Sequence, residues 1–279
     1  MKIKAVIFDM DGLMLDTEKL LVKYWCEAAN ALGFPMERKH ALALRSFSRK
    51  FAIPKLKEWF GEDCDYIAIH DLRVKLMKEY TDVYGIEKKA GLDELLDYLN
   101  KNGYRTAVAT ATNIERAEEY LKKIGVYDKF ETIICGNMLE NGKPCPDIYL
   151  YACERLGLAP CECMALEDSP NGVKSASTAG CVTVMVPDLT QPEKEQLDAV
   201  YAVASSLDKV IEVLEKAKKE QIQKGACSTL FFSVIVPDAC RMGEANFLRY
   251  EDTASANISP EYLRRYNSTM NTVKGNFSS

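Results

Sequence analysis

The sequence predicts an α/β fold with a doubly wound, Rossmann-like parallel sheet and an inserted α-helical cap domain, and three observations support this. Short apolar runs without strict alternation suit strands that are covered on both faces. Helical patterns of about ten residues lie between these runs and often end at glycines. A helix-rich interval of roughly 90 residues separates the first two runs, which is too long for a single crossover helix.

Five apolar runs are predicted to form the strands of the sheet. They are residues 5–8, 106–109, 132–134, 164–166 and 182–186. Three of the intervening helices have clear ends, since the patterns over 92–102, 114–124 and 147–156 stop at Gly103, Gly125 and Gly157. The second of them follows Thr112-x-x-Glu115, the pattern of a capping box. A last, lysine-rich helix is predicted over 207–223.

The helix-rich interval is predicted to be a separate domain inserted after the first strand. It contains helical patterns over 18–32, 44–60 and 66–84. The predicted domains are therefore a sheet core formed by residues 1–16 and 88–224, and a helical cap formed by residues 17–87. Residues 225–279 are rich in Ser, Asn and Thr, and we expect them to be an appended tail with disordered parts.

Composition and charge exclude several classes of function. The net charge of −5 and the absence of a long Lys/Arg block argue against a nucleic-acid partner. No apolar stretch reaches the roughly 20 residues that span a bilayer, so we expect a cytoplasmic protein that does not bind membranes. The ten cysteines contain no C-x-x-C pair and are expected to be reduced and buried. With only two histidines, the chemistry must depend on carboxylates, lysine and hydroxyls.

Two acids follow the first predicted strand. Asp9 and Asp11 lie two residues apart, and Gly12 allows the chain to turn sharply after them. In open α/β sheets, ligands bind beyond the carboxyl ends of the strands, which is where Asp9 would project. Taken alone, this pair is equally compatible with a calcium-like loop or a solvated turn.

Three further strand ends carry polar groups. Thr110 and Thr112 open a helix with hydroxyls and free N–H groups suited to a phosphate. Lys143 lies before two prolines, and Glu167 and Asp168 form an acidic pair that opens another helix. Each segment alone is more typical of a helix cap or a surface lysine. Together, four strand ends that present acids, hydroxyls and one lysine predict a catalytic site.

The segments DMDGLMLDTE, TATN, GKPCPD and EDSPNG resemble the four motifs of the haloacid dehalogenase superfamily. Their order, and the helical insert after the first, resemble its β-phosphoglucomutase-like branch, which includes many phosphatases of sugar phosphates and nucleoside monophosphates. The resemblance covers residues 1–216. The four motifs together are specific for the superfamily and not for the substrate.

The resemblance implies that Asp9 attacks phosphorus and forms a phosphoaspartate. Asp11 would protonate the leaving oxygen and then take a proton from the attacking water. Lys143, Thr110 and the backbone N–H groups near Ala111 would neutralise charge on the transferring group. The acid at position 11 argues against dehalogenation, because the dehalogenases of the family lack it.

The resemblance also implies one Mg²⁺ and contacts to the substrate. Asp9, the carbonyl of Asp11, Asp168 and Glu167 would hold the metal in an oxygen-only shell that water completes. The predicted substrate-binding residues are Ala111, Thr112, Arg49 and Asn171. Arg49 resembles a phosphate-binding position of the mutases, and an exposed arginine in a basic segment is the alternative.

The predicted activity is Mg²⁺-dependent hydrolysis of a small phosphorylated metabolite by a monomer or weak homodimer. A hexose-phosphate mutase is the alternative enzyme. Mutases of this branch carry a histidine shortly after the Asp-Thr pair, where this chain has Leu21 and its neighbours. A non-catalytic, phosphate-sensing module is a third possibility, which the intact acids at the strand ends disfavour.

Overall fold

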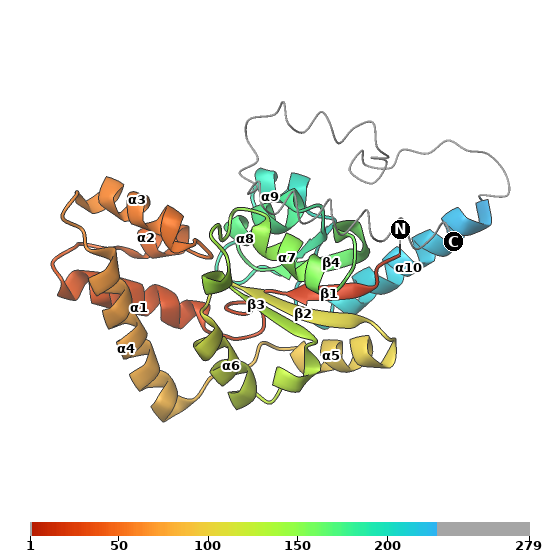
Figure 1. The fold of residues 1–279 in the computed structure, drawn as a ribbon, viewed down its shortest axis with the longest axis horizontal. Coiled ribbons are helices and arrows are strands. Elements are labelled where there is room, and N and C mark those ends of the chain that lie inside the picture. The colour runs from red at the N-terminus through yellow and green to blue at the C-terminus, as the bar shows by residue number, and fades with distance from the viewer. Residues whose placement is uncertain (1, 228–279) are drawn as a thin grey trace.

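The computed structural model describes residues 2–227, which form a parallel six-stranded sheet with helices on both faces and a helical lobe at one end (Figure 1). This confirms the predicted α/β fold with its helical insert. The strand order in the sheet is β3-β2-β1-β4-β5-β6. The strands are β1 (Ala5–Phe8), β2 (Arg105–Thr110), β3 (Thr132–Cys135), β4 (Cys163–Glu167), β5 (Val182–Met185) and β6 (Ala202–Val203).

Helices form the two outer layers and the lobe. The helices of the lobe are α1 (Glu18–Ala31), α2 (Arg38–Ala43), α3 (Arg49–Phe60) and α4 (Tyr66–Tyr84). Those around the sheet are α5 (Leu92–Lys101), α6 (Ile114–Lys123), α7 (Asp147–Arg155), α8 (Pro170–Thr178), α9 (Lys194–Ala199) and α10 (Val210–Cys227). The short 3-10 turns are η1 (Tyr127–Lys129), η2 (Gly136–Met138) and η3 (Pro160–Glu162).

Alternate residues of the central strand face two different cores. Val6 and Phe8 pack in the cluster that includes residues of α5, α6 and α10. Ala5 and Ile7 pack in the cluster on the opposite face, which includes residues of α7 and α8. Because all four side chains are fully buried, the strand shows no polar alternation in its sequence.

The strand order reverses at β1, and this position defines the site. The chain proceeds outward from β1 through β2 to β3, then returns to the other side of β1 with β4. In open α/β sheets, such a reversal leaves a crevice at the carboxyl ends of the strands. Asp9 lies directly after β1 at this point, where its N–H donates to the carbonyl of Leu166 at 3.0 Å.

The lobe, which we call the cap and which comprises α1 to α4, has its own apolar cluster. Buried residues of this cluster include Ala28, Leu56 and Ile69. Figure 1 shows the lobe projecting from the end of the sheet at which the site lies. A separate core is expected of an inserted domain, and its boundaries at residues 17 and 87 stay a prediction.

Four local predictions need correction. The segment predicted as helical over 44–60 contains a loop, because α2 ends at Ala43 and α3 begins only at Arg49. The last helix starts at Val210, after turns that include a hydrogen bond between Ser206 and Asp208. The strand β6 was not predicted, because its two residues are too few to form a pattern. The fourth correction concerns the residue that caps the N-terminus of helix α6, and it is described with the site.

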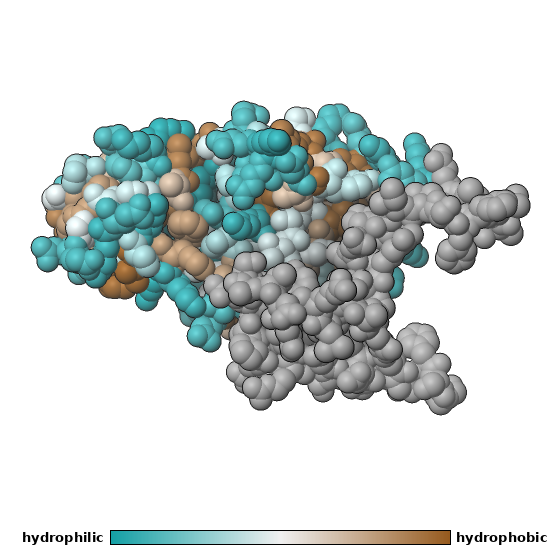
Figure 2. Space-filling model, turned by 90° about the horizontal axis from the view of Figure 1, so that it is seen from above, coloured by the Kyte–Doolittle hydropathy of each residue, from teal (hydrophilic) through white to brown (hydrophobic). Residues whose placement is uncertain are grey.

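The surface and the cysteines agree with the expectations from composition. Figure 2 shows a face on which hydrophilic residues predominate, with hydrophobic residues in small groups between them. No disulfide links the cysteines between residues 2 and 220, and most of these side chains are buried. Over the same range, no helix combines the length and the apolar character needed to cross a bilayer. The predicted tail, residues 225–279, lies outside the described residues except for the end of α10.

Candidate active site

The centre of the site is a buried lysine that connects three strand ends. Lys143 follows β3 and is fully buried. Its Nζ donates to Oδ1 of Asp9 and to Oε1 of Glu167, both at 2.5 Å, and to the carbonyl of Ala109 at 3.0 Å. Tyr149 also donates to Oε1 of Glu167 at 2.5 Å. Asp9, Lys143 and Glu167, which the sequence predicted to converge, are therefore in direct contact.

Asp11 has a different environment from Asp9. Two hydroxyls fix its carboxylate: Thr17 donates to Oδ1 at 2.7 Å, and Thr112 donates to Oδ2 at 2.7 Å. Asp11 is partly exposed and lines the same cavity as Asp9, whose side chain is almost wholly buried. The fixed carboxylate can exchange a proton with a group in that cavity.

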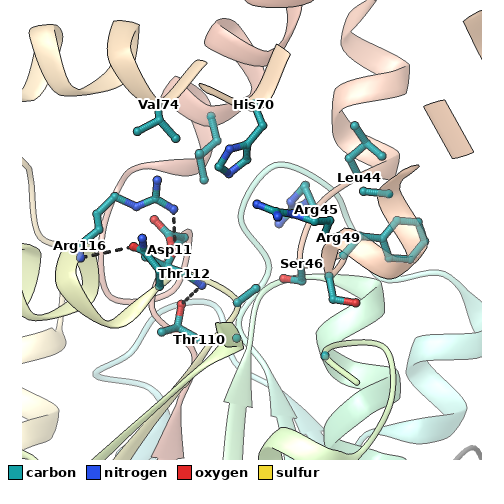
Figure 3. Close-up of a pocket in the computed structure, with 18 of the residues that line it drawn as sticks. Asp11, Leu44, Arg45, Ser46, Arg49, His70, Val74, Thr110, Thr112 and Arg116 are labelled. Carbon is teal, nitrogen blue, oxygen red and sulfur yellow. Dashed lines mark hydrogen bonds between the residues drawn. The ribbon is translucent and has the colours of Figure 1, made fainter. Parts of the chain in front are cut away.

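Thr112 therefore does not cap α6, which corrects the predicted capping box. The N-cap residue is Asn113, whose side chain accepts a hydrogen bond from the N–H of Arg116 at 3.4 Å. The Thr112 hydroxyl donates to Asp11 instead, and its oxygen accepts from Nη2 of Arg116 at 3.2 Å rather than from a backbone N–H of the helix. Thr110 is buried beneath, and its hydroxyl accepts from the N–H of Thr112 at 3.1 Å (Figure 3). Thr110, Ala111 and Thr112 all line the cavity.

A buried acidic cluster lies beside Asp9. Ligand oxygens of Asp9, Glu167 and Asp168 lie within 4.8 Å of one another, and all three residues are buried. Oε2 of Glu167 and Oδ1 of Asp168 have no hydrogen-bond partner. Because unpaired buried oxygens are costly, a cation is the natural partner of this cluster. The oxygen-only donor set fits a hard divalent ion such as Mg²⁺. The side chain of Asp11 is held by hydroxyls, so only its carbonyl could contribute.

Burial dominates the electrostatics of the cluster. It raises the pKa of Asp9 well above the usual range, although the charge of Lys143 opposes the shift. It likewise raises the pKa of Asp168 to about 7, against the opposing charge of Arg45. Burial alone would lower the pKa of Lys143, but Asp9 and Glu167 raise it above its ordinary value. Lys143 therefore stays protonated. The pKa values of Asp9 and Asp168 are raised because the positive charge near them does not offset the effect of burial.

Arg45 reaches this cluster from the cap and was not predicted as a site residue. Its guanidinium pairs with the carboxylate of Asp168, and its Nε lies 3.5 Å from Oε2 of Glu18. The carbonyl of Arg45 accepts a hydrogen bond from the amide of Asn171 at 2.8 Å. Asn171, predicted to bind substrate, is therefore bonded to the cap loop and does not line the cavity. Arg45 is difficult to predict as a site residue, because in the sequence it is an arginine after an apolar run and belongs to no motif.

The cavity above these groups has a volume of about 780 Å³ and lies between the cap and the sheet. Arg49, a predicted substrate-binding residue, lines it, with its Cζ 5.8 Å from the ring centroid of Tyr66. Leu21, near which the resemblance to the mutases would predict a histidine, also lines it. Arg73 and Arg116 were not predicted, because nothing in their spacing separates them from surface residues of α4 and α6.

Comparisons with known proteins agree with this geometry. The family described as haloacid dehalogenase-like hydrolase matches residues 6–186. The chain is 31% identical over 177 residues to a phosphorylated carbohydrates phosphatase of Thermotoga maritima, covering 63% of this chain and 82% of that protein. It is 27% identical over 219 residues to the β-phosphoglucomutase of Bacillus subtilis, and the match covers 76% of this chain and 94% of that protein. The crystal structure of CbbY from Rhodobacter sphaeroides in complex with phosphate superposes with a TM-score of 0.64 at 26% identity. The superposition covers 75% of this chain and 96% of that one.

Proposed function

Because the chain belongs to the family of haloacid dehalogenase-like hydrolases, we propose that it is a Mg²⁺-dependent phosphatase of small phosphorylated metabolites. The observation that supports this most directly is the pairing of two aspartates in one cavity. Asp9 is buried against a lysine, whereas Asp11 is partly exposed and fixed by two hydroxyls. Two carboxyl groups in such different environments suit different roles, one as nucleophile and one as acid and base.

In the first step, a carboxylate oxygen of Asp9 forms a bond to phosphorus while the ester P–O bond breaks. Asp11 gives its proton to the leaving oxygen, so the organic product departs as an alcohol. Lys143 holds the attacking carboxylate in position through its bond to Oδ1. Thr110 and the N–H groups that follow it would bind the oxygens of the transferring group.

In the second step, Asp11 takes a proton from a water that attacks phosphorus, and the acyl-phosphate bond breaks. The products are inorganic phosphate and the free carboxylate of Asp9. Asp9, Glu167, Asp168 and the carbonyl of Asp11 would hold Mg²⁺, which when bound neutralises charge on the transferring group. The raised pKa of Asp9 supports this proposal, since the nucleophile needs more positive charge than Lys143 supplies to be fully ionised.

A mutase would use the same first step, and two observations favour it as the second candidate. The chain has a β-phosphoglucomutase among its relatives, and Arg49 lines the cavity. Against it, the cavity wall carries Leu21, which cannot hydrogen-bond a water or hold Asp11 inactive until a sugar binds. We therefore propose that the phosphoaspartate is discharged to water in the cytoplasm of the source cell.

The test is phosphate release in the presence of Mg²⁺ from a panel of sugar phosphates and nucleoside monophosphates. A parallel reaction contains β-glucose 1-phosphate with a trace of the bisphosphate. Free phosphate is expected to dominate in both, and the Asp9→Asn variant should release none. Rapid formation of glucose 6-phosphate with little phosphate would favour the mutase. Binding without any turnover would instead indicate a phosphate-sensing module.

A further inference from the structure

The cap contributes a buried arginine that has no acidic partner. Arg73 of α4 lines the cavity with only 4% of its surface exposed. No carboxylate between residues 2 and 227 forms an ion pair with it, and its buried Nε has no hydrogen-bond partner. It lies over the ring of Trp25, 5.0 Å from the centroid. A buried charge without a counter-ion is costly, so a structural role alone does not account for it.

A second arginine faces the same space from the sheet domain. The Nη2 of Arg116 donates to the hydroxyl of Thr112 at 3.2 Å, and that hydroxyl donates to Asp11 at 2.7 Å (Figure 3). Burial, followed by the charge of Arg116, lowers the pKa of Arg73 to about 10, so Arg73 is still cationic at neutral pH. The two arginines repel each other, and an anion between them would relieve this repulsion.

The acids that line the cavity do not form an ion pair with either arginine. Asp11 is the acid whose charge raises the pKa of Arg73, but its carboxylate is held by the hydroxyls of Thr17 and Thr112. Glu119 is engaged with Lys123, at 2.6 Å. Asp71 is 70% exposed beside His70, and Glu115 is exposed on the surface of α6. These three acids are therefore solvated at the rim, so that next to Arg73 and Arg116 the two positive charges face the single carboxylate of Asp11.

The position of the pair relative to Asp11 identifies which part of a substrate it would meet. Lys143 and Thr110 lie at the strand ends, where the proposed function places the transferring phosphoryl group. Arg116 lies beyond Asp11, separated from its carboxylate only by the Thr112 hydroxyl. Since Asp11 meets the leaving oxygen in the proposed function, the arginines face the organic part of the substrate.

We propose that Arg73 and Arg116 bind a second anionic group, a carboxylate or a second phosphate, on the leaving-group side of the substrate. This inference rests on the proposed phosphatase function. It predicts that the preferred substrates are phosphate esters of acids or bisphosphates, rather than esters of neutral sugars or polyols. Guanidinium groups suit either anion, because their N–H donors match two oxygens at once.

The test compares kcat/KM for matched esters that differ in one group. The carboxylate pair is 3-phosphoglycerate and glycerol 3-phosphate, and the phosphate pair is fructose 1,6-bisphosphate and fructose 6-phosphate. Wild type is expected to prefer the anionic member of at least one pair by about tenfold or more, the usual contribution of a charged hydrogen bond. Whichever pair shows the preference identifies the anion.

Arg73→Gln and Arg116→Gln are expected to remove that preference, mainly through KM, because they lower kcat/KM for the anionic ester about tenfold more than for the neutral ester. Arg155→Gln, an exposed arginine at the end of α7, is the matched control and should change neither. An equal loss of kcat/KM for both esters of a pair would mean that the arginines act only structurally, and the inference would be wrong. If Arg73→Gln does not fold, the partly exposed Arg116 provides the same comparison.

The inference and the proposed function can fail separately. If no ester releases phosphate, the proposed function is wrong, and calorimetry with the same matched esters still decides whether an anion binds. If esters are hydrolysed without any preference for the anionic member, the function stands and the inference is overturned.

Discussion

Gly172 lies against the carboxylate of Glu167, and a methyl group added there is predicted to disrupt the acidic cluster. A Cβ at this position would lie 2.0 Å from Oε2 of Glu167, whereas ordinary contact begins at 3.4 Å. The carboxylate would thus have to move by about 1.4 Å. It is wholly buried, and Lys143 and Tyr149 hold its Oε1 at 2.5 Å, so the move would break these hydrogen bonds.

The size of the effect follows from two opposing contributions. A hydrogen bond to a charged group contributes about 1.5–3 kcal/mol, whereas alanine is favoured over glycine within a helix by about 0.5–1 kcal/mol. With both bonds lost, Gly172→Ala is expected to lower the free energy of unfolding by about 2–5 kcal/mol. At about 2–4 °C per kcal/mol for a domain of this size, Tm would fall by about 4–20 °C.

The assay is thermal unfolding followed by circular dichroism in EDTA, together with phosphate release in Mg²⁺. The matched control is Thr178→Ala at the exposed end of the same helix, which should change Tm little. Gly172→Ala is also expected to lose most of its activity, because Glu167 would no longer face the cluster. A Gly172→Ala protein with wild-type activity and an equal or higher Tm would refute the reasoning.

Three other changes test the roles of the site and the extent of the fold. Asp9→Asn should abolish phosphate release with an unchanged circular dichroism spectrum, because an amide is a poor nucleophile; activity within tenfold of wild type would contradict the mechanism. Asp11→Asn should give a burst of p-nitrophenol from p-nitrophenyl phosphate and then almost none, and a variant without the burst would show that Asp11 is needed earlier. Truncation after Cys227 should preserve activity, since every site residue precedes it; an insoluble or inactive fragment would mean that residues 228–279 belong to the fold.

The sheet and its polar edge could be predicted because a parallel sheet imposes local rules. Each buried strand is an apolar run, and each carboxyl end lies at the same edge. Asp9, Lys143 and Glu167 could therefore be expected to converge although more than 150 residues separate the first from the last. Their contact in the structure follows from their positions at this edge: Asp9 directly follows β1, Glu167 is the last residue of β4, and Lys143 lies in the loop beyond β3.

The cap side of the site could not be predicted in the same way. Arg45 pairs with Asp168 across 123 residues of sequence, and helical periodicity does not indicate which domain a buried face will meet. Thr112 shows a second limit, because the next residue, Asn113, offers an equally suitable capping oxygen, and the partners of the Thr112 hydroxyl, Asp11 and Arg116, are set by the fold. Arg73 looks like an ordinary charge on an amphipathic helix until the lobe is packed against the sheet.

The buried charges around Asp9 do not balance, which leads to a prediction about the metal. Among the described residues, the buried acids of the cluster are Asp9, Glu18, Glu167 and Asp168, and its buried bases are Lys143 and Arg45. Four negative charges and two positive charges leave a formal charge of −2. One divalent cation would neutralise it, and a monovalent cation would not.

Mg²⁺ is therefore expected to stabilise the folded protein independently of any substrate. A ligand at a hundred times its Kd stabilises by about 2.7 kcal/mol, which corresponds to a rise in Tm of about 5–11 °C. KCl at equal ionic strength controls for screening and should give a much smaller rise. Asp168→Asn should lose most of the response, because it removes one ligand and one of the negative charges that the cation neutralises. A wild-type Tm that is the same in EDTA and in Mg²⁺ would sink the charge-balance argument, since two uncompensated buried charges should not be indifferent to a divalent ion.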